Sequence, residues 1–196
     1  MERDVVDLVQ YYIEQTGIQK IALAGGVFAN VRLNQKLTEQ CSIADMFVFP
    51  NMGDAGLAVG AALCLGNQQW GWTTTTLDNV FLGMDVSEEQ ILSALQQSGL
   101  LYQPLKNPSQ EIANRLAQGE IIARCSGRME YGPRALGNRS ILADPGNSEI
   151  NQRLNKALQR SDFMPFAPII TAEAQDEYLD CSSNTHRAMQ FMTVTV

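Results

Sequence analysis

The sequence predicts an α/β fold divided into two parts. Residues 20–24 and 46–50 are apolar segments, each followed by a glycine-containing turn and a helical pattern. Two consecutive units of this kind are typical of an α/β layer that binds ligands at the carboxyl ends of its strands. The pattern is interrupted at residues 68–79 by QQWGWTTTTLDN, which predicts a linker, and a second region of helical and strand patterns follows it.

The first part begins with a predicted helix over residues 2–16 that stops at Gly17. Six apolar residues recur on one face of this helix: Val5, Val6, Leu8, Val9, Tyr12 and Ile13. Four further elements are predicted in the first part: a short buried strand with a glycine turn (KIALAGG, 20–26), an amphipathic helix (NVRLNQKLTEQ, 30–40), a strand with a glycine turn (MFVFPNMGDAG, 46–56) and a small-residue helix with Gly66 as its stop (LAVGAALCLG, 57–66).

The second part begins with a helix in which Ser87 and Gln90 form a capping-box pattern. The next predicted helix has Asn107 as its N-cap, Pro108 at its first position and Gly119 as its stop. Four more elements are predicted along the rest of the chain: a strand at 120–127, a helix at 147–159, and strands at 166–173 and 190–196.

The composition indicates a globular protein with a hydrophobic core, because the 196 residues are 45% hydrophobic and 18% charged. The longest apolar stretch, around Gly56–Leu65, is too short for a bilayer, and the first residues lack the apolar region of a signal peptide, so we expect no membrane association. The few possible zinc ligands are scattered: Cys41, Cys64, Cys125, Cys181 and the single histidine, His186. This spacing argues against a zinc site and predicts reduced thiols in a cytoplasmic protein.

The charge is distributed unevenly along the chain. The net charge is −7, yet residues 124–160 contain seven Lys or Arg and only three Asp or Glu. A nucleic-acid-binding protein is more often basic overall, so we expect no nucleic-acid partner. A local basic region on an acidic chain instead indicates a small anionic ligand.

The strongest candidate site is the arginine loop, GRMEYGPRALGNRS at residues 127–140. Arginine binds phosphate and carboxylate oxygens through two parallel hydrogen bonds, and a glycine-rich backbone adds N–H donors for an anion nest. Five side chains of the loop are candidate anion ligands: Arg128, Arg134, Arg139, Asn138 and Ser140. Lys156 and Arg160, four residues apart on one predicted helix face, extend the same positive field to phosphates. The alternative is a surface loop whose arginines pair with Glu130 and Asp144.

Two glycine-containing turns are further candidate sites. Gly25 and Gly26 allow a ligand to approach the backbone, and the next helix offers N–H groups to a phosphate. Asn30 either reaches a ribose or nucleotide oxygen or caps that helix. Asp54 either binds a metal or a phosphate-bound cation, or caps the following helix.

These segments, in this order, resemble the carbamoyltransferase family that includes nodulation and antibiotic-tailoring O-carbamoyltransferases. Four matches carry the resemblance: Gly25, Gly26 and Asn30; Gly53–Gly56 with Gly60–Ala62; GRMEYGPRALGNRSILADP at residues 127–145; and FMPFAP at residues 163–168. The third match is nearly the family signature letter for letter, and its GPRALGNRS core is highly specific. The resemblance spans most of residues 20–170.

The resemblance implies part of an actin-like ATPase (ribonuclease H-like) domain over residues 1–78, followed by a partial α+β YrdC-like domain over residues 83–196. In such enzymes the YrdC-like domain uses carbamoyl phosphate and ATP to form carbamoyl adenylate. The actin-like domain transfers the carbamoyl group to a hydroxyl or amine of a small-molecule acceptor, with an iron-type divalent metal nearby. The motif matches assign three roles: phosphate binding in catalysis to Arg128, Arg134, Arg139 and Ser140; the border of the adenylate to Gly25, Gly26 and Asn30; and metal binding to Asp54.

The chain also departs from the family pattern. The paired metal-binding histidines are missing, because the single histidine, His186, lies in the second part. The N-terminal half of the actin-like fold is absent, and the last predicted strand stops at the final residue. We therefore expect a fragment of a longer carbamoyltransferase that is inactive alone, and the sequence leaves a homodimer open.

Two other classes of protein remain as alternatives. A small-molecule kinase of the actin-like superfamily would account for residues 20–66 but not for GPRALGNRS. A non-enzymatic RNA-binding module would use the basic segment, but that segment has few aromatic side chains for stacking and the rest of the chain is acidic.

Overall fold

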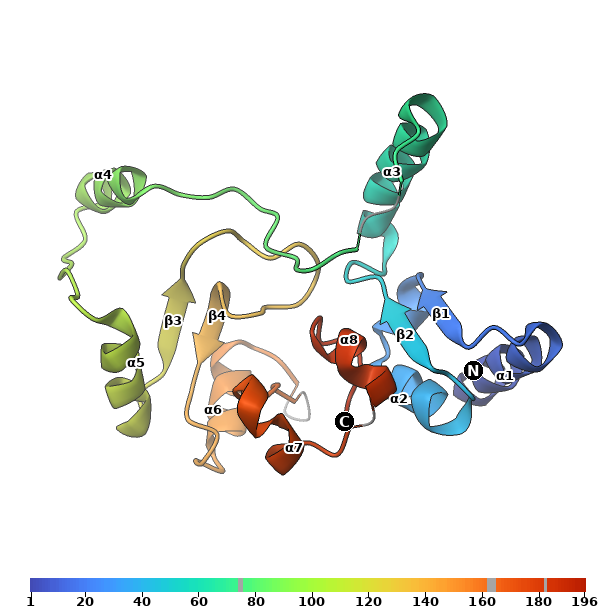
Figure 1. The fold of residues 1–196 in the computed structure, drawn as a ribbon. Helices are drawn as coiled ribbons and strands as arrows, with labels where there is room; N and C mark the ends of the chain where they lie inside the picture. The colour runs from blue at the N-terminus through green and yellow to red at the C-terminus, as the bar shows by residue number, and fades with distance from the viewer. Residues whose placement is uncertain (74–75, 162–164, 182) are drawn as a thin grey trace. The chain divides into compact units, whose positions relative to one another are not determined.

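The computed structural model has a mixed α/β fold (Figure 1). The structure describes four ranges: residues 1–73, 76–161, 165–181 and 183–196. It divides into two compact units: unit 1, of residues 1–80, 131–134 and 170–196, and unit 2, of residues 81–130 and 135–169. The arginine loop is therefore shared, since its four central residues belong to unit 1 and its flanks to unit 2.

Unit 1 is built on a two-stranded parallel sheet. Strand β1 (Lys20–Leu23) pairs with β2 (Asp45–Val48), with Lys20 opposite Asp45 and Leu23 opposite Val48. The described helices of this unit are α1 (Glu2–Thr16), α2 (Val31–Gln40), α3 (Leu57–Trp70), α7 (Gln175–Tyr178) and α8 (His186–Met189). Short 3₁₀ turns lie at η1 (Gly26–Ala29), η2 (Asp54–Gly56), η3 (Ala172–Ala174) and η4 (Ser183–Thr185).

The core of unit 1 joins the sheet to helices from both ends of the chain. Its buried apolar residues are Val6, Ile13, Leu33, Leu37, Cys41, Ile43, Met46, Val48, Met52, Ala188 and Val194. The ring of Phe191 lies edge-on to Phe47 at a centroid distance of 6.2 Å. The Asn34 side-chain amide donates to the carbonyl oxygen of Thr193 at 2.6 Å. The C-terminal segment is thus part of the same core as the parallel sheet.

Unit 2 contains a two-stranded antiparallel sheet and three described helices. Strand β3 (Ile122–Cys125) pairs with β4 (Arg139–Leu142), and Cys125 lies opposite Arg139. The helices are α4 (Glu88–Ser98), α5 (Pro108–Ala117) and α6 (Ile150–Ala157). The arginine loop is therefore the connection between two paired strands.

Three of the local helix signals of the sequence are confirmed. Gly17 ends α1 in the left-handed conformation. The Ser87 hydroxyl and the Gln90 side chain form the predicted capping box at the start of α4. The Asn107 side chain accepts from the backbone N–H of Gln110, and Pro108 is the first residue of α5. These signals are read correctly from the sequence because each depends only on neighbours along the chain.

Both strands predicted near the C-terminus are wrong. Residues 166–173 form no strand, and Pro168 in this range has no N–H to donate to a sheet. Residues 190–196 follow α8 as a turn with Met192 at φ 53°, a left-handed conformation incompatible with an extended strand. Phe191 and Val194 of this segment are buried within unit 1, so their apolar pattern reflects burial and not strand pairing.

The end of helix α3 also differs from the prediction. Helix α3 continues through Gly66 and ends at Gly71, so residues 68–70 of the predicted linker are helical. At Gly66 the ring of Trp72 lies where a side chain would be, which explains a glycine inside the helix.

Strand β1 was expected to be buried, but its residues alternate between exposed and half-buried, because β2 is its one partner among the described residues. The predicted Thr73–Thr76 run includes Thr74 and Thr75, which lie outside the described residues, as do Phe163 and Met164 of FMPFAP.

No helix in the described part of the chain has the length and apolarity needed to cross a membrane.

Candidate functional site

The arginine loop is organised in unit 2 by the carboxylate of Glu130. This side chain is 7% exposed, and its Oε1 accepts three backbone N–H bonds, from Leu136 (2.8 Å), Asn138 (2.7 Å) and Arg139 (3.2 Å). Burial alone would raise the pKa of the Glu130 carboxyl, but the backbone N–H donors outweigh it and hold this pKa below its usual value. The loop therefore forms the predicted nest of backbone N–H donors. The three N–H groups of Leu136, Asn138 and Arg139 are already bonded to a carboxylate of the same loop.

The polar side chains at the C-terminal end of the loop also bond within it. The Arg139 guanidinium donates to the carbonyl oxygens of Ser126 (3.1 Å), Gly127 (3.1 Å) and Asn138 (3.0 Å). The Asn138 amide donates to the carbonyl oxygen of Arg128 at 2.8 Å. The Ser140 hydroxyl accepts the N–H of Gly137 at 2.9 Å. These contacts hold the loop in one conformation. Arg139 bonds to carbonyl groups and not to Glu130 or Asp144, so the alternative in which the arginines pair with these two acids is wrong for Arg139.

The centre of the loop, residues 131–134, is part of unit 1. The Tyr131 ring packs against Phe49, with centroids 6.1 Å apart, and its backbone N–H donates to the Val80 carbonyl at 2.6 Å. Gly132 has φ 111°, and a Cβ added there would lie 3.0 Å from the carbonyl oxygen of Pro50. Only glycine therefore suits this close passage beside the segment that follows β2.

Arg134 is brought to the glycine turn that follows β1. Its Nη2 lies 3.4 Å from the carbonyl oxygen of Ala29, a long hydrogen bond. Its Nε is buried, and no hydrogen-bond partner for it lies among the described residues. Because buried polar atoms are nearly always hydrogen-bonded, this N–H is a donor available to an anionic oxygen. The Tyr131 hydroxyl, on the same segment, is also buried with no partner in the described part of the chain.

The glycine turn is open where the sequence predicts ligand access. Gly25 has φ 112°, and no atom lies within 4 Å of a Cβ placed on Gly25 or on Gly26. The Gly25 N–H donates to the carbonyl oxygen of Met52 at 2.8 Å, which ties the turn to the segment after β2. The structure thus brings Arg134 to Ala29, at the end of the turn that begins with Gly25 and Gly26, within unit 1.

Asn30 has a structural role in this turn. Its Oδ1 accepts hydrogen bonds from the backbone N–H groups of Arg32 and Leu33, both at 3.1 Å. Asn30 therefore caps α2, which is one of the two roles that the sequence left open. Its amide donates to Glu2 at 2.9 Å, and Glu2 also pairs with Lys36 at 2.6 Å. The N-terminus of α2 is therefore already satisfied by a side chain.

Asp54 begins η2 and is exposed. Among the described residues, no three or more His, Cys, Asp or Glu side chains are grouped closely enough to hold a metal ion. A single carboxylate leaves most coordination positions of an iron-type ion to water. The residues around Asp54 therefore do not fit the metal that the resemblance implies.

Lys156 and Arg160 do not share a helix face, contrary to the prediction. Helix α6 ends at Ala157, and Gln159 adopts φ 53°, so Arg160 lies beyond the helix that carries Lys156. The Arg160 guanidinium lies over the Phe166 ring, 4.6 Å from its centroid. Lys156 and Arg128 are exposed. Their predicted roles in phosphate binding stay predictions.

Two residues of the site were missed by sequence reasoning. The sequence presents Glu130 only as a possible counter-charge for the arginines, and it does not point to Tyr131. The available signal for Glu130 was that it is the one acid in a loop rich in backbone donors. For Tyr131 the sequence offers no signal, because its contact with Phe49 joins residues far apart in the chain.

Comparison with known proteins gives the family. Residues 1–63 match the family model of the carbamoyltransferase N-terminus, and residues 113–196 match that of the carbamoyltransferase C-terminus. The chain is 37% identical to nodulation protein NolO of Bradyrhizobium diazoefficiens, over 100% of this chain and 36% of that protein. It is 34% identical to nodulation protein NolNO of Sinorhizobium fredii, over 100% of this chain and 29% of that protein. An uncharacterised protein of Methanocaldococcus jannaschii is 34% identical over 97% of this chain and 33% of its own length.

This chain belongs to the carbamoyltransferase family, as its arginine loop and glycine turns predicted. It spans about a third of the length of the curated relatives that it matches.

Proposed function

We propose that this chain supplies part of the anion site of a carbamoyltransferase. The proposed enzyme uses carbamoyl phosphate and ATP to form carbamoyl adenylate, and then carbamoylates a hydroxyl or amine of a small-molecule acceptor. The observation that carries the proposal is Arg134, whose buried Nε has no partner in the described part of the chain and whose Nη2 lies beside the open glycine turn.

The chemistry of these residues fits a phosphate. A guanidinium presents Nε–H and Nη–H donors in one plane, which matches two oxygens of a phosphate or carboxylate. Gly25 and Gly26 have open space over their backbone, in the turn that Arg134 contacts at Ala29. Carbamoyl phosphate and ATP bring several negative charges together, and a fixed arginine stabilises the charge that develops during transfer.

In the proposed reaction, water attacks the phosphorus of carbamoyl phosphate, the bond from phosphorus to the carbamoyl oxygen breaks, and inorganic phosphate and carbamate form. A carbamate oxygen bonds to the α-phosphorus of ATP as pyrophosphate leaves. The acceptor oxygen or nitrogen then bonds to the carbamoyl carbon, loses its proton, and AMP leaves. Arg134 would hold phosphate oxygens, and the contacts of Glu130 and Arg139 would keep the loop in one conformation. No step is assigned to a metal, because the surroundings of Asp54 do not fit one.

The finer assignments of fold and location belong to the same proposal. From the motif matches we assign residues 1–78 to an actin-like domain and residues 83–196 to a YrdC-like domain, although residues 170–196 pack in unit 1. The four free cysteines support a reducing, cytoplasmic location.

Titration of the full chain with ATP, and separately with carbamoyl phosphate, tests the anion site. Arg134→Lys keeps the charge but loses the planar pair of N–H donors, so the binding of ATP or carbamoyl phosphate should weaken about tenfold or more. Arg124→Lys, at an exposed position on β3, is the matched control and should bind like the wild type. Equal binding by Arg134→Lys and the wild type would exclude Arg134 as the phosphate ligand.

The transfer reaction is tested in a full-length family member. Labelled carbamoyl phosphate and ATP should yield AMP, pyrophosphate and a labelled acceptor. We expect lysine at the position matching Arg134 to lower turnover roughly ten- to a hundredfold. Turnover within a factor of two would show that this arginine contributes only a general positive field.

A further inference from the structure

The four central residues of the arginine loop, 131–134, lie beside the carboxyl ends of both strands of unit 1. Gly132 passes the carbonyl oxygen of Pro50, in the segment that follows β2. Arg134 contacts Ala29, at the end of the 3₁₀ turn that follows β1. Open α/β folds bind their ligands outside the carboxyl ends of the strands. This segment therefore lies where a ligand of unit 1 is expected.

The Tyr131 side chain is held at the β2 end of this segment. Its ring packs edge-on against Phe49, the residue after β2, with the centroids 6.1 Å apart. Its backbone N–H donates to the Val80 carbonyl oxygen at 2.6 Å. The hydroxyl is different, because it is buried and bonds to none of the residues that the structure describes. Buried polar atoms are nearly always hydrogen-bonded, so this hydroxyl is available to a ligand.

Arg134 provides a second buried donor on the same segment. Its Nε also has no partner within the described ranges of the chain. Tyr131 and Arg134 are three residues apart, so their Cα atoms are separated by at most about 11 Å. Both residues belong to unit 1. Two unsatisfied donors this close together suit one ligand that has several acceptor oxygens.

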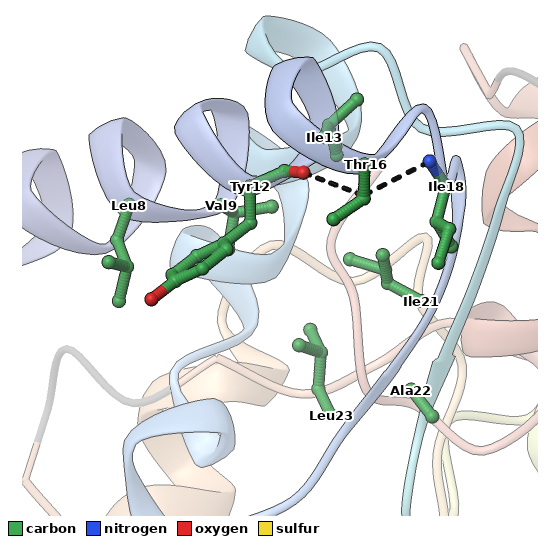
Figure 2. A pocket seen from close by; sticks show the side chains of 9 residues that line it. All are labelled: Leu8, Val9, Tyr12, Ile13, Thr16, Ile18, Ile21, Ala22 and Leu23. Carbon is green, nitrogen blue, oxygen red and sulfur yellow. Dashed lines mark hydrogen bonds between the residues drawn. The ribbon is translucent and has the colours of Figure 1, made fainter.

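The apolar groove between helix α1 and the segment that includes β1 is a different kind of cavity. Its volume is about 300 Å³, and the described side chains that line it carry no charge (Figure 2). The Thr16 hydroxyl in this groove is satisfied, because it donates to the Tyr12 carbonyl oxygen at 2.7 Å and accepts from the Ile18 N–H at 3.2 Å. Tyr12 is 58% exposed. The groove therefore does not suit an anion, and Tyr12 serves as a control tyrosine in the same unit.

We propose that the Tyr131 hydroxyl is a ligand of the anion that Arg134 holds, and that it donates a hydrogen bond to a phosphoryl oxygen. This inference rests on the proposed function, because it needs a phosphate-containing ligand at this site. Arg134 supplies the positive charge, and Tyr131 adds a neutral donor. A hydrogen bond to an ionised oxygen is stronger than one between neutral groups, so the loss of this single hydroxyl is measurable as weaker binding.

Tyr131→Phe tests the inference, because it removes the hydroxyl and keeps the ring that packs against Phe49. The full chain is titrated by calorimetry with carbamoyl phosphate and, separately, with ATP. We expect the Kd of at least one ligand to rise about tenfold or more in Tyr131→Phe. The two titrations show which ligand contacts the hydroxyl. Tyr12→Phe makes the same chemical change in the groove and should bind both ligands like the wild type.

Thermal unfolding without ligand separates a binding role of the Tyr131 hydroxyl from a structural one. A buried hydroxyl with no partner destabilises the folded chain, so Tyr131→Phe should raise Tm by about 2–4 °C. Tyr12→Phe removes a hydroxyl from an exposed side chain and should leave Tm unchanged. Weaker binding together with an undiminished Tm is the result that supports the inference.

The failure of this inference can be told apart from the failure of the proposed function. If Arg134→Lys weakens binding but Tyr131→Phe binds both ligands like the wild type, the inference is wrong and the proposed function stands. If Arg134→Lys also binds like the wild type, the proposed function fails, and the inference fails with it. A Tm of Tyr131→Phe more than about 2 °C below that of the wild type would also overturn the inference, because the hydroxyl would then bond within the folded chain.

Discussion

The carboxylate of Glu130 accepts a 2.7 Å hydrogen bond from the backbone N–H of Asn138, eight residues further along the chain. With the bonds from Leu136 and Arg139, it closes the arginine loop around residues 131–134. A segment that sequence reasoning treats as a set of cations is thus held in shape by its own anion.

Replacing Glu130 with alanine should destabilise the full chain by about 1–3 kcal/mol, because three backbone donors lose a charged acceptor. Urea unfolding followed by circular dichroism measures this change. Glu149→Ala, at an exposed position in the same unit, is the matched control and should change stability by less than about 0.5 kcal/mol. An equal, small effect of both changes would show that the observed bonds of Glu130 do not stabilise the loop.

The same carboxylate predicts a dependence of stability on pH. The folded-state pKa of Glu130 lies below its usual value near 4.5, so its contribution is complete above about pH 4.5 and is lost as the pH falls through the folded-state pKa. Unfolding curves between pH 3 and 7 should therefore show a larger loss of stability at low pH in the wild type than in Glu130→Gln. Parallel pH profiles for the two proteins would contradict this prediction.

Metal binding by this chain should be weak. Asp54 is the one metal ligand that the family pattern assigns here, and a single carboxylate binds an iron-type ion poorly. Titration with ferrous or manganous ion should show no site tighter than roughly millimolar. Stoichiometric micromolar binding that disappears in Asp54→Ala would mean that a functional metal site exists.

The predicted domain boundary lies between residues 70 and 82, and protease digestion tests it. No Lys or Arg occurs between Lys36 and Lys106, so chymotrypsin or thermolysin is used in place of trypsin. We expect the first cut between Trp70 and Leu82, where few contacts cross a domain boundary. A competing site is Leu101, which is fully exposed. A first cut there, or inside residues 20–66, would contradict the boundary.

Local features of this chain could be predicted from the sequence, and features that join distant residues could not. Ser87 with Gln90, and Asn107 with Pro108, mark helix starts through contacts within three residues. Strand β4 was missed because its four residues, Arg139–Leu142, become a strand only by pairing with β3.

The candidate site shows the same limit. The sequence identified Arg134 and the glycine turn as separate elements, and the contact to Ala29 spans 105 residues of chain. It also identified nest-forming donors in the arginine loop, but not the carboxylate that occupies them. The sequence shows which donors and acceptors are present, but which of them bond to one another depends on the folded path of the loop.

The close passage of Gly132 beside Pro50 has a genetic consequence. Any other residue at position 132 combines an unfavourable φ of 111° with a Cβ about 3.0 Å from a carbonyl oxygen. The change would shift the path that carries Arg134 to the glycine turn, although glycine has no functional group of its own. A saturation screen for loss of phosphate binding should therefore return position 132 as often as the arginine two residues later.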